Sequence, residues 1–281
     1  MKKFVLLILV SIVLQGVNAQ GSQTNKLTFD TLCYAIRNNV KLNVEIISSK
    51  NIGKENPAII FFFGGGWLGG SRDQFRPQAE YLANKGIITI LADYRTKKLG
   101  NATPFNCVED AKSAIRFIKE NSKKLKIDTT KIVTSGGSAG GHLAAACAYV
   151  SHYNHPDDNL SISSRPSALI LFNPVIDNGE NGYGFERIKD EYVNFSPLHN
   201  LKNNNALPTI FMVGSKDRYV PTETAEKYKL STEENGAKCI LKIYEEQKHG
   251  FFNYKKNGDN TYYDITLKEA EKFLNELGYI K

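Results

Sequence analysis

The sequence predicts one α/β domain with a mostly parallel central sheet, helices on both faces and a small cap insert. Three observations support this prediction. Short runs rich in β-branched and aromatic residues alternate with helical runs, the strand-like runs are almost continuously apolar, and one long segment between two of them lacks periodicity. Such strands are expected where helices cover both faces of a parallel sheet, and their alternation with helices implies right-handed βαβ units.

The strands and helices are predicted from these runs in chain order. The predicted strands are residues 58–63, 86–94, 131–135, 168–175, 208–214 and 238–246. The predicted helices are residues 76–85, 107–125, 140–150, 221–236 and 261–277. In the second helix, Val108, Ala111 and Ile115 recur at helical spacing. Residues 28–49 come before this pattern and predict an antiparallel hairpin with a turn at Arg37-Asn38-Asn39.

Two segments lack periodicity, residues 151–167 and residues 177–207. A long irregular loop inside a compact domain usually has a function, and residues 177–207 lie between two predicted strands. We expect them to fold over the carboxyl edge of the sheet as a small cap. The chain has no internal repeat and no low-complexity linker, so residues 20–281 are predicted to form a single catalytic domain.

Residues 1–19 have the pattern of a signal peptide. Two lysines precede an apolar run at residues 4–14, and small residues lead up to a cleavage position after Ala19. A membrane anchor is the alternative, but the apolar run is short compared with the roughly 20 residues that a span needs. We therefore expect export to the periplasm or the medium, with no membrane attachment after cleavage.

The composition argues against a nucleic-acid-binding protein. Of the 281 residues, 41% are hydrophobic and 23% are charged, which is ordinary for a globular domain. The formal charge of +7 is spread along the chain, without a dense Lys/Arg block among aromatic residues. A solvated basic surface explains this pattern better than a nucleic-acid site. The sequence does not predict an oligomeric state.

The four cysteines show no metal-binding pattern. Cys33, Cys107, Cys147 and Cys239 are widely spaced and form no CxxC or Cys/His group, so no metal site is expected. Cys147 lies in an alanine-rich helical run and is predicted to be a small buried residue. One disulfide is possible in an exported chain, but the spacing does not define its pairing.

Ser138 is the candidate nucleophile. It lies in Gly136-Gly137-Ser138-Ala139-Gly140, a G-x-S-x-G pattern between a predicted strand and a predicted helix. A strand that turns at once into a helix strains the serine backbone and exposes its hydroxyl, and small residues two positions away on either side let the chain pass. A tight glycine turn with an idle serine is the alternative. Ser135 lies inside the strand end and is the poorer candidate.

The predicted base is His249 and the predicted acid is Asp217. Each follows its own strand, and active-site groups of open α/β sheets lie beyond the carboxyl ends of the strands. A turn-forming aspartate and a surface histidine would each be unremarkable alone. The chain order Ser138, Asp217, His249 is that of α/β hydrolases, which makes chance less plausible. His249 would accept the serine proton and Asp217 would orient His249. His142 is expected to pack, and His152, His155 and His199 to lie at the surface.

The triple glycine after the first parallel strand predicts an oxyanion hole. Its backbone N–H groups can point inward without obstruction by side chains, so Gly65 and Gly66 are the predicted donors beside Ala139. Trp67, the next residue, either walls the acyl pocket or packs the loop. The motif Gly64-x-Gly66-x-x-Gly69, with Asp93 after the next strand, also matches a dinucleotide fingerprint.

Three arguments oppose a dinucleotide site. Trp67 is bulky for a loop that approaches a pyrophosphate, an exported protein has little access to NAD, and the predicted triad would be left unexplained. Asp93 is instead expected to pair with Arg95 or to cap the loop.

Several segments together resemble the α/β-hydrolase esterases of the hormone-sensitive-lipase-like type, above all the exported acetyl and feruloyl esterase modules of hemicellulose-degrading bacteria. The resemblance extends from about Asn56 to the C-terminus and rests on FFFGGGW, LADYR, VEDAKSAIRFIKENS, GGSAGGHLAA, LFNPVID, FSPLHNL, PTIFMVGSKDRYVP and KHGFF. It implies the same roles for Ser138, Asp217 and His249. One departure is Phe63, which stands where the family has a histidine, so we expect Phe63 to order the oxyanion loop by packing alone and to border the substrate pocket.

The sequence and the resemblance together imply an exported serine esterase. Its substrates would be short acyl esters, in particular acetyl groups on plant poly- or oligosaccharides, and it would need no metal and no cofactor. The alternatives are a peptidase or lipase-like hydrolase of the same fold, and a catalytically silent hydrolase fold that binds a ligand.

Overall fold

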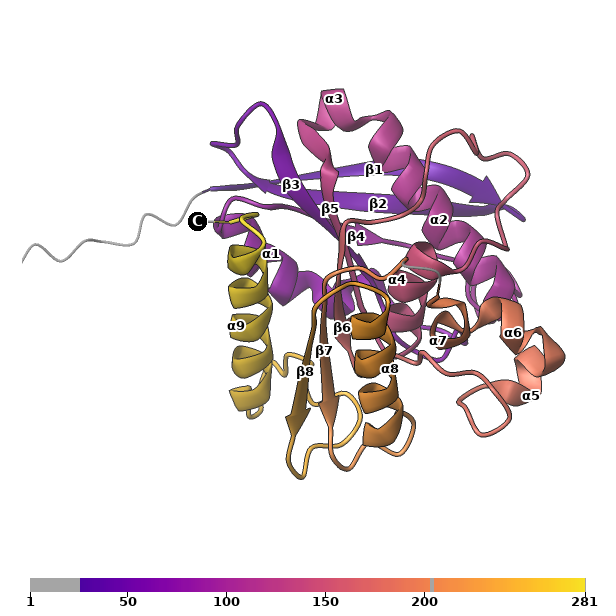
Figure 1. The fold of residues 1–281 in the computed structure, drawn as a ribbon. Coiled ribbons are helices and arrows are strands. Elements are labelled where there is room, and N and C mark those ends of the chain that lie inside the picture. The colour runs from indigo at the N-terminus through magenta and orange to yellow at the C-terminus, as the bar shows by residue number, and fades with distance from the viewer. Residues whose placement is uncertain (1–25, 203–204, 281) are drawn as a thin grey trace, which may run out of the picture.

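A computed structural model describes residues 26–202 and 205–280, and these residues form one eight-stranded sheet with the order β1-β2-β4-β3-β5-β6-β7-β8 (Figure 1). The strands are β1 (Leu27–Arg37), β2 (Val40–Ser49), β3 (Asn56–Phe62), β4 (Ile88–Ala92), β5 (Ile127–Gly137), β6 (Ala168–Phe172), β7 (Thr209–Gly214) and β8 (Cys239–Tyr244). The helices are η1 (Arg72–Phe75), α1 (Arg76–Asn84), α2 (Pro104–Glu120), α3 (Ser122–Leu125), α4 (Ala139–Tyr149), α5 (Phe185–Ile188), η2 (Lys189–Glu191), α6 (Tyr192–Phe195), α7 (Pro197–Asn200), α8 (Thr222–Glu234) and α9 (Thr261–Glu276). The predicted α/β class is confirmed.

The sheet is mostly parallel, with an antiparallel hairpin at one edge. Strands β1 and β2 pair antiparallel, β2 joins β4 antiparallel, and every pairing from β4 through β3 to β8 is parallel. The hairpin turns at Asn38 and Asn39, whose φ angles are 48° and 61°. Two successive positive φ values match the twist of a two-residue hairpin, and asparagine tolerates them better than most residues. The predicted hairpin is therefore confirmed.

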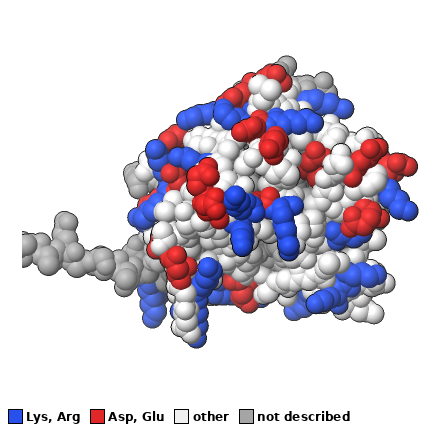
Figure 2. Space-filling model, turned by 90° about the horizontal axis from the view of Figure 1, so that it is seen from below, with Lys and Arg blue, Asp and Glu red and all other residues white. Residues whose placement is uncertain are grey.

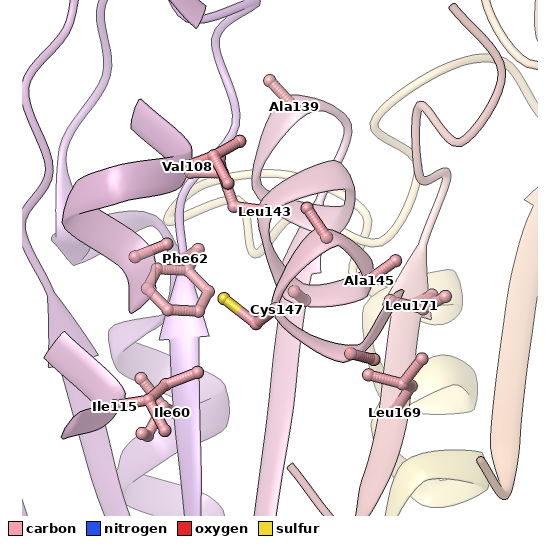
Figure 3. Close-up of a cluster of buried hydrophobic side chains, with 14 of the residues drawn as sticks. Ile60, Phe62, Val108, Ile115, Ala139, Leu143, Ala145, Cys147, Leu169 and Leu171 are labelled. Carbon is pink, nitrogen blue, oxygen red and sulfur yellow. The ribbon is translucent and has the colours of Figure 1, made fainter. Parts of the chain in front are cut away.

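Two hydrophobic layers cover the sheet. Helices α1 and α9 pack on one face, and α2, α4 and α8 pack on the other (Figure 1). Figure 3 shows part of the second layer, where Leu143 and Cys147 of α4 lie among side chains of β3, β6 and α2. Because α4 begins immediately after Ser138, this buried contact fixes the start of the helix against the sheet.

The segment 177–207 contributes the short helices α5, η2, α6 and α7, and α7 lies beside α4 (Figure 1). The segment extends over the carboxyl edge of the sheet, where Tyr183 lines the same pocket as Ser138. The predicted cap is confirmed.

The cysteines form no disulfide. All four are free thiols; Cys33 is exposed and the other three are buried. Burial raises the pKa of the Cys147 thiol to about 12, in keeping with its predicted packing role.

The predicted signal peptide, residues 1–19, lies outside the described residues. Among the described helices, none is long and apolar enough to cross a membrane.

Candidate active site

Ser138 lies at a sharp turn between β5 and α4. Its backbone has φ 54° and ψ −120°, an unusual conformation for a residue with a side chain, and its side chain is partly exposed. A Cβ atom at Gly136 would lie 2.4 Å from the Gly140 carbonyl, and one at Gly140 would lie 2.1 Å from the Phe62 carbonyl oxygen. Both flanking positions therefore require glycine, as the motif predicts. Ser135 is fully buried and has no access to substrate.

Asp217 and His249 form a hydrogen-bonded pair at the ends of β7 and β8. The His249 Nδ1 atom lies 2.7 Å from Asp217 Oδ2. Asp217 Oδ1 accepts hydrogen bonds from the backbone N–H groups of Tyr219 and Val220, at 2.9 and 3.1 Å, and Oδ2 accepts a further one from Asn173 Nδ2 at 2.7 Å. A carboxylate held by several donors cannot rotate freely, so His249 is fixed with its second nitrogen available for another partner.

One pocket brings four of the predicted residues together: Ser138, His249, Gly65 and Gly66. Ser138 and His249 line a cavity of about 240 Å³ with Gly64, Gly65 and Gly66; we call it the reaction pocket. Carbonyl substrates that enter it would meet a hydroxyl, an imidazole and a glycine loop at once. This convergence is the arrangement that acyl transfer requires.

The glycine loop offers free backbone donors. Among the described residues, no side chain or carbonyl accepts a hydrogen bond from the N–H of Gly65 or Gly66. Ala139 is the first residue of α4, where the N–H groups have no partner inside the helix. Gly65 has φ 123°, and a Cβ atom there would lie 1.9 Å from the Gly69 carbonyl oxygen. The loop conformation therefore depends on glycine.

Phe63 does not border the reaction pocket, so that part of the sequence prediction is wrong. Its ring is 3% exposed and stacks on Tyr94 with 4.0 Å between ring centroids. Packing is also not the only restraint on the loop. The Tyr94 hydroxyl donates to the Phe63 carbonyl at 2.7 Å, and the Gln74 side chain accepts from the Gly64 N–H at 2.6 Å. Hydrogen bonds with Tyr94 and Gln74 thus hold the loop, at the position where Phe63 replaces the histidine of the resembling family.

Trp67 packs the loop and does not wall the reaction pocket. Its side chain is 1% exposed, and it contacts the rings of His142 and Phe195 edge-on, with centroids 5.2 and 5.9 Å away. Its backbone has a positive φ of 61°, which is unusual for a residue other than glycine. Of the two roles predicted for Trp67, the structure therefore shows the packing role, and Trp67 and Phe63 both lie beneath the glycine loop.

Asp93 does not pair with Arg95. The Asp93 carboxylate instead receives Arg72 Nη1 at 2.5 Å and the Asn43 N–H at 3.2 Å, while Arg95 pairs with the buried Asp110. Arg72, just after the glycine loop, thus takes the place beside Asp93, and Arg95 is held by Asp110. The acid that a dinucleotide site would need for a ribose contact is engaged in this ion pair.

The other histidines divide into a buried one and more exposed ones. His142 is fully buried, as predicted, and burial lowers its pKa to about 3. His152 is exposed and His155 is half-buried. His199 is not simply a surface residue, since it is half-buried and lines a second cavity beside the cap.

Three further residues of the site escaped the sequence analysis. Asn173 follows β6 at the same sheet edge as the predicted residues, so the rule about strand ends was a signal for it. Tyr219 stands two residues after Asp217, and its ring edge lies against His249 with 5.0 Å between centroids. Tyr183 comes from the irregular cap, where no periodicity indicates which side chains face inward.

An arginine of the cap, Arg187, contacts the glycine loop. Arg187 Nη1 donates to the Gly66 carbonyl at 2.6 Å, and its guanidinium lies over the rings of Trp67 and Tyr183, 5.2 and 5.3 Å from their centroids. These contacts tie the cap to the loop that carries Gly65 and Gly66.

Strands β7 and β8 point downward in Figure 1, so the view from below in Figure 2 faces their carboxyl ends. Lys and Arg side chains on this face are interspersed with Asp and Glu.

No group of three or more His, Cys, Asp and Glu side chains in residues 26–202 and 205–280 is arranged to hold a metal ion.

Two protein-family models together match most of the chain. The BD-FAE model matches residues 44–184, and the model of the dienelactone hydrolase family matches residues 182–276. An acetylxylan esterase of Xylanibacter ruminicola is 28% identical over 214 residues, and a probable isoprenylcysteine α-carbonyl methylesterase of Oryza sativa is 27% identical over 220 residues. These alignments cover 70% and 69% of this chain, which spans 42% and 50% of the two relatives.

Solved structures match over nearly the whole chain. Esterase 2 of Thermogutta terrifontis, phosphoramylated by tabun, is 40% identical with a TM-score of 0.84, and the match covers 90% of this chain and 96% of that one. The same esterase with bound propionate is 39% identical with a TM-score of 0.82, and covers 90% and 95% of the two chains.

Proposed function

This chain belongs to the α/β-hydrolase esterases, and from that membership we propose that Ser138, His249 and Asp217 form the catalytic triad of a serine carboxylesterase. The observation that carries the proposal is the hydrogen bond between His249 and Asp217 beside a strained serine in one pocket. The free N–H groups of the glycine loop supply the remaining component, an oxyanion hole.

The geometry supports a two-step reaction. Ser138 Oγ attacks the ester carbonyl carbon while His249 Nε2 takes the hydroxyl proton, and Asp217 stabilises the resulting imidazolium. The N–H groups of Gly65, Gly66 and Ala139 bind the oxygen that becomes negative. His249 then passes its proton to the leaving alcohol. A water molecule attacks the acyl-serine with His249 as base, which releases the acid and restores Ser138.

We propose short acyl esters as substrates, and acetyl esters of carbohydrates in particular. The reaction pocket of about 240 Å³ is small, which suits a short acyl chain. The likeness to an acetylxylan esterase and to a structure that holds propionate supports this choice. We further propose that the chain is exported after cleavage near Ala19, on the basis of the pattern in residues 1–19. The proposed chemistry needs no cofactor.

Hydrolysis of p-nitrophenyl acetate tests the nucleophile. We expect Ser138→Ala to lose at least about a thousandfold in kcat, because the attacking oxygen is removed. Ser135→Ala is the matched control, since Ser135 is buried three residues earlier and forms no side-chain hydrogen bond with the described residues. Retained hydrolysis in Ser138→Ala, or a comparable loss in Ser135→Ala, would refute the assignment.

A further inference from the structure

The glycine loop and His249 come from distant parts of the sheet. The glycine loop follows β3, whereas His249 lies in residues 245–260, between β8 and α9; we call this second segment the histidine loop. In the sheet, β5, β6 and β7 lie between β3 and β8 (Figure 1). Acyl transfer needs the oxyanion donors and the base at a fixed separation, and a misplacement of about 1 Å can cost about a hundredfold in rate. A direct link between the two loops would hold that separation.

Two side-chain amides join the loops. Gln74 Oε1 accepts a hydrogen bond from the Gly64 N–H at 2.6 Å, and Gln74 Nε2 donates to Asn253 Oδ1 at 2.8 Å. Asn253 Nδ2 in turn donates at 2.8 Å to the carbonyl of Gly250, the residue after His249. Gln74 and Asn253 both line the reaction pocket. We call this chain of three hydrogen bonds the amide bridge.

The two ends of the amide bridge determine the orientation of both amides. A backbone N–H only donates, so the Gln74 atom beside Gly64 is the carbonyl oxygen, and the Gln74 NH2 group faces Asn253. A backbone carbonyl only accepts, so the Asn253 NH2 group faces Gly250, and the Asn253 oxygen faces Gln74. The two assignments agree at the central contact, where an NH2 group meets an oxygen. Rotation of either amide by 180° would bring two donors or two acceptors together, so each amide has one favoured orientation.

Aromatic residues next to the two amides hold the backbone on both sides of the bridge. Phe75 follows Gln74 and Phe252 precedes Asn253, and the two rings stack with 5.7 Å between their centroids. Both rings are buried. The loops therefore stay in contact without the amides, and a change at Gln74 or Asn253 should alter the alignment of the loops without unfolding the site.

We propose that Gln74 and Asn253 are positioning residues, which fix the oxyanion donors of the glycine loop relative to His249. The inference rests on the proposed esterase function, because it concerns the same reaction. The amide bridge holds the Gly64 N–H, directly before the donors, and the carbonyl directly after His249. The negative oxygen and the imidazolium exist together only in the transition state and the tetrahedral intermediate, so their alignment lowers the barrier more than it strengthens substrate binding.

A double-mutant cycle on p-nitrophenyl acetate tests this inference. We expect Gln74→Met and Asn253→Leu each to lower kcat about tenfold with little change in KM, because either change breaks the amide bridge. The double variant should also lose about tenfold, since the two residues act through one chain of hydrogen bonds. The kcat is expressed per site that a fluorophosphonate labels, so misfolded protein is not counted.

Gln247→Met is the matched control. Gln247 is a half-buried glutamine of the histidine loop, two residues before His249, and it lies outside the lining of the reaction pocket. Its side chain donates to the Glu245 carbonyl at 3.3 Å. Its replacement should leave kcat unchanged.

Inhibition by a trifluoromethyl ketone separates positioning from a purely structural role. Ser138 Oγ adds to the ketone carbon, the hydroxyl proton moves to His249, and the ketone oxygen becomes the anion that the oxyanion hole binds. The inhibition constant should rise in Gln74→Met and Asn253→Leu by about the factor by which kcat/KM falls, and it should stay unchanged in Gln247→Met.

Three results would overturn the inference: an unchanged kcat in the single variants, a hundredfold loss in the double variant, or an unchanged inhibition constant. Failure of the esterase proposal would instead appear in the unmodified protein, which would neither hydrolyse p-nitrophenyl acetate nor bind the ketone.

Discussion

Ser138 and Asn173 both have positive φ angles, and each follows the end of a strand at the carboxyl edge of the sheet. Ser138 has φ 54°, and Asn173, directly before Pro174, has φ 44°. Residues other than glycine rarely adopt this region, and a following proline restricts the backbone further. Such strain persists only where the surroundings hold it, and it gathers at functional sites. At Asn173 it directs the amide to the Asp217 carboxylate.

Asn173 helps to hold the Asp217 carboxylate, which in turn orients His249. Removal of the Asn173 amide should therefore slow catalysis. We expect Asn173→Gly, which suits the positive φ, to lower kcat by about ten- to hundredfold with little change in KM. The reason is that a hydrogen bond to a charged group contributes about 1.5–3 kcal/mol. Steady-state kinetics on p-nitrophenyl acetate measure the effect.

Asn38→Gly is the matched control, because Asn38 has a φ of 48° in the distant hairpin turn. It should leave kcat unchanged. An Asn173→Gly enzyme with normal kcat would show that the remaining donors to Asp217 suffice.

At the scale of elements, Arg187 joins the cap to the glycine loop. Arg187→Met keeps much of the apolar stem and removes the hydrogen bond to Gly66. We expect kcat to fall about tenfold, since the loop donors lose their alignment. Trp67 is the single tryptophan of the chain and lies under the guanidinium, so its fluorescence should change as well.

Lys189→Met provides the control for this change. Lys189 is exposed in the same insert, and its replacement should alter neither kcat nor the Trp67 emission. If Arg187→Met leaves both readouts unchanged, Arg187 does not position the loop.

The strands could be predicted from the sequence because burial on both faces of the sheet makes each strand an almost continuous apolar run. All six predicted strands appear, and their ends shift for local reasons. Residues 168–175 were expected as one strand, but β6 ends at Phe172, since Pro174 cannot donate to a sheet hydrogen bond. Strand β5 begins at Ile127 instead of residue 131, directly after Lys126 in a left-handed conformation.

The sequence did not predict which way the large side chains near the glycine loop point. Trp67 and Phe63 are large and apolar, and such residues suit a pocket wall and a buried support equally well. Their orientation depends on distant partners, Tyr94 for Phe63 and His142 for Trp67, which periodicity does not place. The placement of Ser138, Asp217 and His249 at one edge of the sheet was predictable because each of them follows a strand. Tyr183 was not, because the cap has no regular pattern.

At the scale of the whole molecule, buried His142 links stability to pH. Folding lowers its pKa from the ordinary value of 6.5 to about 3, so the unfolded chain binds a proton that the folded chain excludes. Its stability contribution is present above pH 6.5 and is lost as the pH falls toward 3. At pH 4.5 the loss from this group is about 3 kcal/mol, since each pH unit in this window contributes roughly 1.4 kcal/mol.

Urea unfolding at several pH values measures this link. His142→Gln should show a shallower loss of stability between pH 6.5 and 4.5 than the unmodified protein, whatever its stability at neutral pH. Exposed His152 is the control, and His152→Gln should keep the original slope. Equal slopes in all three proteins would mean that His142 does not exclude its proton.

The central claim, that Ser138 is the nucleophile, is tested most directly by mapping a covalent adduct. The protein is treated with a fluorophosphonate, and peptide fragmentation locates the added mass. We expect one adduct on Ser138, which is retained in Ser135→Ala and absent from Ser138→Ala. An adduct on another residue, or none on a protein that hydrolyses esters, would contradict the assignment of Ser138 as the nucleophile.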